Sequence, residues 1–540
     1  VYINANTRPT LSNCTFLNNS ATEEAGAIRS TYGGGQGLLV FDRLSFIDNV
    51  ADSFCGAVSI GNHPSSTQFK DCLFQGNKAL GGQAAALSFT VTARTQENTV
   101  PKTDTFLRVR FVENVATLNG AAVVVQHSFP SQDVVFRDCI FENNSADAWG
   151  GAVSIAGAGN TSFFSTQFLS NRARSLGGAV AVRSEESTAE GKVYFIDSVF
   201  RNNTAISGGG ALSCAQGQSA TTHTIVTNTI FDENSALAAG GALHYKCSYL
   251  TVSGGRFKAN RAIDGNGGAI SLGAQAVCAD GTNKTRFQEV AFLDNVASVG
   301  GGVVFFDHVS PSCRLPILED GTFNVSDPTW SWQDPDALLR GNNASYGLLQ
   351  ATAPAKISAQ CVDVNVSNGM SALAGCRRIQ NGSLSSTVFA KAFVGMEVEL
   401  VCTMTDDFGQ LVAGKNAGVG VQVEASLANA SAPYDTRGLH RFWFDAGRVF
   451  VAGLSIVGIS GAAQSTQVLL LSVPKVLVEY SYLPPAEVKL DFGLCPAGWV
   501  LAGDGDVRCS ACPGGYFAPT SAAECTLCAA GMYAARQGSA

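Results

Sequence analysis

A three-residue frame recurs ten times along the first part of the chain, and it constrains the fold more than any other feature. Each copy places asparagine three residues after a phenylalanine and alanine five residues after it. The phenylalanines are Phe16, Phe46, Phe74, Phe111, Phe141, Phe168, Phe200, Phe231, Phe257 and Phe292. The asparagines are Asn19, Asn49, Asn77, Asn114, Asn144, Asn171, Asn203, Asn234, Asn260 and Asn295. A repeat of this length is typical of a solenoid.

The distance between successive phenylalanines runs from 26 to 37 residues, and nearly all of the variation falls in one place. A glycine or alanine stands ten residues after each phenylalanine, often as the second member of a Gly-Gly pair, and a short apolar run follows it, as in GGAVSI from Gly150 to Ile155. Length differences collect between that run and the next phenylalanine, for example at Thr90 to Asp104. A solenoid with one extensible turn in each coil has this pattern.

The apolar runs decide which solenoid is expected. VSI, AVVVV, AVAV and AISL are short and rich in β-branched residues, so they predict strands. The fold class is therefore all-β, with a parallel β-helix of about ten to eleven coils that stack about 4.8 Å apart. We expect the phenylalanines to stack inside it and the asparagines to form a structural ladder, at turns where asparagine tolerates left-handed backbone angles. The Gly pair permits a tight turn. For these asparagines and glycines, a structural role is preferred to a role in ligand binding.

Two segments resemble known families. The alternation of FENN with GGAV, and of FRNN with GGAL, resembles the repeat of the polymorphic membrane protein family. That resemblance implies a right-handed parallel β-helix at a cell surface, implicated in adhesion in bacteria. The segment CPAGWVLAGDGDVRCSACPGGYFAPTSAAECTLCAAGMY is similar to ephrin-receptor-like and TNF-receptor-like cysteine-rich modules. In combining this repeat with such a cysteine-rich segment, the chain resembles large surface proteins of algae and protists.

Three domains are predicted. Residues 1–350 form the β-helix, and LLRGNNASYG, with Leu339, Asn342 and Ala344, is its degenerate last coil. Residues 351–490 alternate polar and apolar positions in short segments, which predicts an immunoglobulin-like β-sandwich. The apolar run Val449–Ala463 is short for a membrane span, and a pair of sandwich strands is the preferred interpretation. Residues 491–540 form a truncated cysteine-rich module, so a membrane anchor is expected beyond Ala540.

The 16 cysteines indicate an oxidising compartment. The candidate disulfides are Cys278–Cys313, Cys214–Cys247, Cys361–Cys376, Cys495–Cys509 and Cys512–Cys525, with Cys528 left for a partner beyond the chain. Two C-x2-C pairs in the last segment would also suit zinc, but no histidine lies near them. Cys14, Cys72 and Cys139 each precede a phenylalanine by two residues, so we expect them to be small inward-facing side chains on coils too far apart to bridge.

N-x-S/T sequons also favour an extracellular location. The glycosylation candidates are Asn18, Asn143, Asn202, Asn283 and Asn343. The first three share one position in the frame, directly before the ladder asparagine, so glycans on them would form a row.

Neither catalytic residues nor a metal or other cofactor site is predicted. The net charge of −8 and the absence of a basic run argue against nucleic acid as a partner. The six histidines occupy no shared position. Acidic residues stand two after the phenylalanine at Asp48, Glu113, Glu233 and Asp294; a calcium- or glycan-binding edge and a solvated turn both fit them, and the solvated turn is preferred.

The sequence therefore favours a non-enzymatic extracellular structural or adhesion ectodomain that contacts glycan, matrix or protein at a cell surface. Two alternatives stay open. One is a polysaccharide lyase or hydrolase on a β-helix scaffold, and the other is the ectodomain of a single-pass signalling receptor.

Overall fold

The computed structural model contains β-strands and no helices in the part of the chain that it describes. It describes residues 1–532 apart from 5–8, 32–37, 62–65, 91–101, 128–131, 158, 185–190, 217–221, 274–277, 280–281, 284, 308–338, 353, 362–376, 380–386, 393, 396, 413–421, 430–433, 459–465, 474–482, 504–506, 521 and 530–531. The chain folds as two compact units, Val1–Ala353 and Pro354–Ala540.

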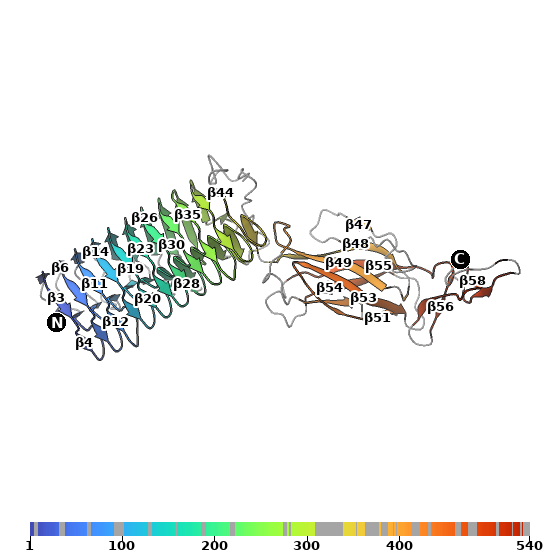
Figure 1. Cartoon of the computed structure of the whole chain (residues 1–540), viewed down its shortest axis with the longest axis horizontal. Coiled ribbons are helices and arrows are strands. Elements are labelled where there is room, and N and C mark those ends of the chain that lie inside the picture. Colours follow the sequence, from blue (N-terminus) through green and yellow to red (C-terminus); the bar gives the residue numbers. More distant parts are fainter. Residues whose placement is uncertain are drawn as a thin grey trace. The chain divides into compact units, whose positions relative to one another are not determined.

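The first unit is a β-solenoid of four parallel sheets (Figure 1). One rung contributes one strand to each sheet, for example β17 (Val123–His127), β18 (Gln132–Arg137), β19 (Ile140–Glu142) and β20 (Ser145–Ala146). In the described residues the sheets hold 12, 10, 11 and 10 strands, and every fourth strand of the chain is a neighbour in the same sheet over most of the length. We call them the first to fourth sheets in that order. The predicted all-β solenoid is confirmed.

The first sheet runs from β1 (Tyr2–Asn4) to β45 (Gln350–Thr352), and the third runs from β3 (Thr15–Leu17) to β44 (Leu339–Arg340). β44 pairs with β41 (Ala291–Leu293), so the degenerate coil at Leu339 is part of the stack. The proline that follows, Pro354, begins the second unit.

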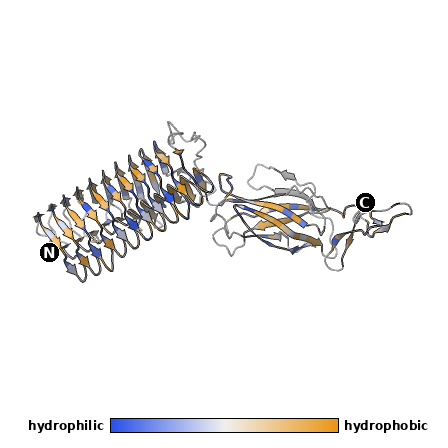
Figure 2. Cartoon of the chain, in the orientation of Figure 1, coloured by the Kyte–Doolittle hydropathy of each residue, from blue (hydrophilic) through white to orange (hydrophobic). Residues whose placement is uncertain are grey.

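The frame phenylalanines lie directly above one another. Phe141 pairs in register with Phe111 below it and Phe168 above it, and the ring centroids are 4.7 and 4.9 Å apart with nearly parallel planes. A second column that the frame does not include, with Phe136 and Phe163, stacks in the second sheet and meets the first column edge-on. Offset stacking of this kind adds about 0.5–1.5 kcal/mol per pair beyond the burial of ring surface. The core of the solenoid is therefore two aromatic columns lined by aliphatic side chains. Figure 2 shows hydrophobic and hydrophilic residues interspersed along the strands.

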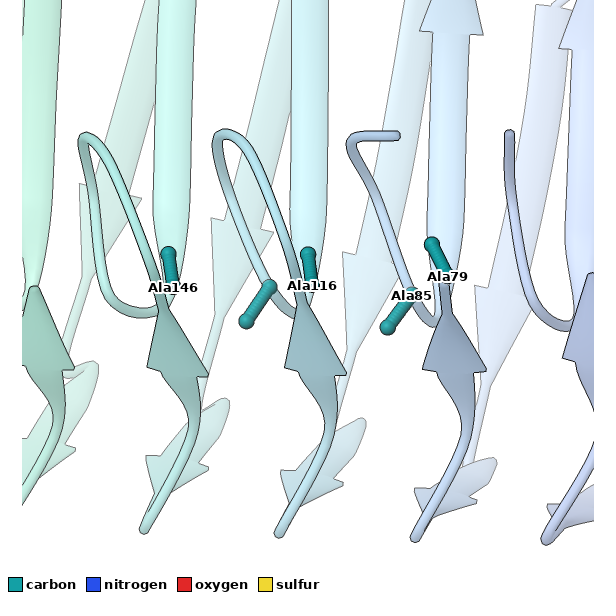
Figure 3. Close-up of a cluster of buried hydrophobic side chains, with 5 residues drawn as sticks. Ala79, Ala85, Ala116 and Ala146 are labelled. Carbon is teal, nitrogen blue, oxygen red and sulfur yellow. The ribbon is translucent and has the colours of Figure 1, made fainter. Parts of the chain in front are cut away.

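Small residues close the corner beside the fourth sheet. Ala79, Ala116 and Ala146 occupy equivalent places on successive strands and pack with Ala85 and Ala121 (Figure 3). All five are at most 1% exposed. The interior is narrow between the two-residue strands of the fourth sheet and the turn that follows them. Alanine is the side chain that fits there, which explains its recurrence five residues after each phenylalanine.

Each rung turns at three residues with left-handed backbone angles. In the rung of Phe141 these are Asp138 (φ 53°), Asn143 (φ 55°) and Gly150 (φ 67°). The prediction that the ladder asparagine adopts the left-handed angle is wrong: that residue is the one before it. The second glycine of the pair, Gly151, is needed for a different reason, since a Cβ there would lie 2.0 Å from the carbonyl oxygen of Gly178.

The second unit contains two main sheets that are mostly antiparallel. The four-stranded sheet holds β46 (Lys356–Cys361), β49 (Glu397–Thr405), β53 (Arg448–Gly458) and β51 (Tyr434–Gly438). The six-stranded sheet holds β47 (Arg377–Ile379), β48 (Thr387–Ala392), β55 (Ala486–Phe492), β54 (Thr466–Ser472), β50 (Gln422–Leu427) and β52 (Arg441–Trp443), with β48 and β55 parallel. The ring of Tyr434 stacks on that of Phe492 between the sheets.

The apolar run that begins at Val449 lies within β53, in the middle of a sheet, as far as Gly458. Alternate residues of that strand are buried, which is the pattern of a sheet with one covered face. The immunoglobulin-like topology of this unit stays a prediction.

The cysteine-rich segment contacts these sheets. The backbone N–H of Cys509 donates to the carbonyl oxygen of Val394 at 2.7 Å, and Gly458 and Val507 exchange two backbone hydrogen bonds. The segment holds β56 (Trp499–Ala502), β57 (Arg508–Ala511), β58 (Tyr516–Phe517) and β59 (Thr526–Leu527). Residues on both sides of the predicted boundary at 490/491 are therefore in one compact unit.

Candidate functional site

The asparagine ladder runs through the solenoid as one unbroken chain of hydrogen bonds. The Oδ1 of Asn171 accepts from the backbone N–H of Asn144 at 3.0 Å and from its Nδ2 at 2.9 Å. The Nδ2 of Asn144 also donates to the carbonyl oxygen of Phe111 at 3.0 Å. Because each side chain uses its acceptor twice and both of its donors, an uncharged amide is completely paired in a buried place.

The ten predicted ladder positions form one chain of hydrogen bonds that extends to Asn342 in the last coil, and the members from Asn49 to Asn295 repeat the full set of contacts. The Nδ2–Oδ1 distances between successive members lie between 2.7 and 3.0 Å. The members from Asn49 to Asn295 are fully buried. No polar atom of these side chains is directed at solvent, so the ladder is a structural element and no binding group.

The turn directly outside the ladder carries the acidic residues that suggested a cation- or glycan-binding edge. Asp48 and Glu113 both have left-handed backbone angles, and Gly76 occupies the same turn on the rung between them. Glu233 and Asp294 are likewise separated by Ala259. The carboxylates are therefore never on adjacent rungs, and within the described residues no three His, Cys, Asp or Glu side chains gather as metal ligands do.

Three glycosylation candidates share this turn. Asn18, Asn143 and Asn202 are exposed, each with φ 55°. Asn343, beside the end of the ladder, is also exposed. The side chain of Asn283 lies outside the described residues. The three that share the turn are positioned so that glycans on them would leave the solenoid along one edge.

Three of the five candidate disulfides join described cysteines. Cys214 and Cys247, on successive rungs of the solenoid, are bonded, as are Cys495–Cys509 and Cys512–Cys525 in the second unit. Cys278–Cys313 and Cys361–Cys376 involve side chains outside the described residues. Cys528 forms no disulfide within the described part of the chain.

The three cysteines that precede a phenylalanine are free thiols. Cys72 and Cys139 are buried, and burial raises the pKa of the Cys139 thiol to about 12. Such thiols are inert at neutral pH. Cys14, in the first of the described rungs, is exposed.

Another turn of the solenoid lies three residues before each phenylalanine, and six of the ten residues at this position are charged, a feature that the sequence frame does not reveal. Arg108 donates to both carboxylate oxygens of Asp71, at 2.6 and 3.0 Å. The hydrogen bond from Arg108 holds the pKa of Asp71 below its usual value. Arg43, one rung before Asp71, donates to Asn13 at 2.9 Å. The residue type at this position varies from coil to coil, so only its spacing from the phenylalanine identifies the column.

Two histidines, His127 and His244, are buried in the solenoid. His244 stands in register with Ser213 and Ser271 of the neighbouring rungs, and its Nδ1 has no hydrogen-bond partner among the described residues. Burial, followed by the nearby positive charge of Lys246, lowers the pKa of His244 to about 4. His244 is therefore a packed side chain of the solenoid interior.

Replacing a ladder asparagine tests how much the ladder stabilises the fold. In Asn144→Ala, the two donors of Asn114 lose their acceptor, and Asn171 and Phe111 lose a donor. Stranding buried polar groups costs about 1–3 kcal/mol each, so we expect a loss of at least about 3 kcal/mol in the free energy of unfolding. The matched control is Asn143→Gly, which keeps the left-handed turn and is expected to change stability by at most about 0.5 kcal/mol. Equal losses in urea unfolding would contradict the assigned roles.

His244 makes the stability depend on pH in a defined direction. Its pKa is lower in the folded chain (about 4) than in the unfolded chain (6.5), so the unfolded state binds more protons between these values. Stability is therefore fully present above pH 6.5 and falls as the pH approaches 4, by up to about 3 kcal/mol from this residue. His244→Ser, which restores the residue of the neighbouring rungs, is expected to flatten the fall in urea midpoint between pH 7 and 4.5. Parallel curves for the two proteins would show that His244 makes no such contribution.

Comparison with known families identifies the repeat. The model of the Chlamydia polymorphic membrane protein repeat matches residues 138–156 and 197–215. Each match begins just before β19 or β27 (Val199–Arg201) and ends within a strand of the first sheet, so each covers most of the path from one frame phenylalanine through the Gly-Gly turn.

No match identifies the cysteine-rich segment as ephrin-receptor-like or TNF-receptor-like. Searches of curated proteins and of solved structures return no match to the chain. Among the described residues, no helix is long and apolar enough to span a membrane. The solenoid of this chain thus contains repeats of the Chlamydia polymorphic membrane protein type.

Proposed function

We propose that this chain is a non-enzymatic structural or adhesion ectodomain, displayed outside the cell, whose solenoid presents variable connections to a partner. The match of two segments to a membrane-protein repeat supports the location. The disulfides support an oxidising compartment. A right-handed coil, an immunoglobulin-like second unit and glycans at the exposed sequons belong to this proposal.

The observation that carries the proposal is where the rungs differ in length. The connection from the first to the second sheet has eleven residues between β13 (Leu87–Thr90) and β14 (Lys102–Leu107), and four between β17 and β18. The other turns of these rungs are short and pair in register. Differences in rung length therefore fall between the strands of the first sheet and those of the second, at one edge of a regular scaffold, which is where recognition loops are commonly placed.

The outer face of the second sheet, next to that edge, also carries half-buried aromatic side chains. The guanidinium of Arg137 lies 4.1 Å from the centre of the Phe164 ring, and the His223 ring lies 4.1 Å from that of Tyr249. Tyr194 lies between these pairs along the sheet. Aromatic and guanidinium groups together suit contact with a glycan or a protein surface better than hydrolysis of a polymer.

The test separates adhesion from polysaccharide cleavage. Beads that carry the full chain are expected to bind cells or matrix glycans, with no shortening of acidic or neutral polysaccharides with or without calcium. Exchanging residues 91–101 for the four-residue connection 128–131 shortens the longest connection, so we expect at least a several-fold loss of bead binding. Leu118→Ala, at a side chain exposed on the fourth-sheet side of the rung, is the control and should bind normally. Polysaccharide turnover that a single carboxylate substitution abolishes would replace this proposal with the enzymatic one.

A further inference from the structure

An exposed column of side chains runs along the solenoid at the residue that follows each frame alanine. In most rungs the backbone N–H of this residue donates to the frame alanine of the preceding rung, as Leu80 does to the carbonyl oxygen of Ala51 at 2.9 Å. The same bond joins Leu237 to Ala205 at 3.1 Å. Members of the exposed column therefore follow one another at the rung spacing of about 4.8 Å. Because the frame alanine points into the core, the residue after it points outward.

Aliphatic side chains occupy several places in the exposed column. Four of its members are between 40% and 53% exposed, and they are Leu80, Ile206, Leu237 and Ile263. The last three lie on consecutive rungs, so they form one continuous apolar strip. On the rung after Leu80, Leu118 lies one residue beyond the column and is 45% exposed. Single exposed leucines are ordinary, but a row of them marks a contact surface.

One acid and one base separate the two apolar parts of the exposed column. Asp147 and Arg174 are members on adjacent rungs, and Nε of Arg174 lies 3.2 Å from Oδ1 of Asp147. Both side chains are more than half exposed. An ion pair this exposed adds little to the stability of the chain itself, so intramolecular stability is a weak reason for its place between apolar rows.

The charges are complementary to those of a second copy that runs in the opposite direction. A two-fold axis that passes between the rungs of Asp147 and Arg174 places each of them opposite the unlike charge of the second copy. Two copies that run in the same direction, at the same height, would place like charges opposite each other, which is unfavourable. The charges therefore favour the antiparallel arrangement.

The aliphatic side chains meet in that same arrangement. One rung out from the charges, Leu118 is opposite Ile206 of the second copy. Two rungs out, Leu80 is opposite Leu237. Each contact occurs twice, because a two-fold axis brings the same patch of both copies together.

The outer end of this contact is charged again. Three rungs out, Asp52 in the exposed column is opposite the rung that holds Arg261, and both residues are exposed. From Asp52 to Ile263 the exposed column extends over eight rungs, which is about 34 Å at the rung spacing. The complementary order thus continues over most of the repeats.

We propose that the solenoid pairs with a second copy of this chain, side by side and antiparallel, through the exposed column. The pairing covers the aliphatic rows and places each Asp147 between two guanidinium groups, that of its own Arg174 and that of the second copy. Because the apolar part of the contact is narrow, the affinity is expected to be about micromolar. The exposed column precedes the strands of the first sheet and the connections of variable length follow them, so these connections stay uncovered for another partner.

Sedimentation velocity of the full chain, produced without glycosylation, tests the pairing. Cys14 and Cys528 are alkylated first, so that no disulfide joins two copies. We expect a monomer–dimer equilibrium, and Leu237→Asp, which puts an unpaired charge opposite Leu80, should weaken dimerisation at least about tenfold. The matched control is Leu38→Asp, at a side chain 47% exposed at the start of β6 (Leu38–Asp42) in the second sheet, and it should dimerise like the natural chain.

Exchange of the two charges tests the orientation. Asp147→Arg places like charges opposite each other and is expected to weaken dimerisation at least about tenfold. The double variant Asp147→Arg/Arg174→Asp exchanges the charges without changing the net charge, and it should recover the natural affinity. A natural chain that stays monomeric at high micromolar concentration, dimerisation that Leu237→Asp leaves unchanged, or a double variant as weak as Asp147→Arg would overturn the proposal. Circular dichroism of each variant establishes that it has folded.

Discussion

Stacking of identical side chains in exact register between rungs is the constraint on which the first unit depends. A rung of this solenoid has too few internal contacts to be stable by itself, because the strands of the four sheets, two to six residues long, pair only with strands of other rungs. The buried amide of each ladder asparagine is satisfied only if the next rung supplies an Oδ1 at the same height. A slip by one residue would therefore bury unpaired donors and move each phenylalanine to the outer face.

The repeat explains why so much of this unit is readable from the sequence. Phe141, Asn144 and Ala146 each perform one task that recurs in every rung, so one physical requirement appears ten times. The frame also predicts the last rung correctly. Leu339 continues the third sheet and Asn342 continues the ladder, although the surrounding coil is degenerate. The residue type that the ladder requires is also clear: only an uncharged side chain with both donors and an acceptor completes the pattern without burying charge.

Features that occur once are less predictable. The residue after the frame alanine differs from rung to rung, so the order of Asp147, Arg174 and the aliphatic side chains around them is seen only once the rungs are stacked. The column of Arg43, Asp71 and Arg108 lies at a constant distance before the phenylalanine, but the residue type at that position varies from rung to rung. In the second unit, alternation predicts strands but not their partners, so the parallel pairing of β48 with β55 had no signal. The close backbone contacts of Cys509 and Val507 with the sheets were equally hidden, because they depend on tertiary structure.

The register itself is tested most directly by paired cysteines on the outer face of the third sheet. Val199 and Ile230 are register partners on neighbouring strands, and such partners lie about 4.8 Å apart, within the Cα range of a disulfide. Arg201 and Ile230 are offset by two residues, which places their Cα atoms about 8 Å apart. Mild oxidation of Val199→Cys/Ile230→Cys is expected to give nearly complete disulfide formation, and Arg201→Cys/Ile230→Cys little. Preferential cross-linking of the offset pair, or none in either, would contradict the stacked-rung structure.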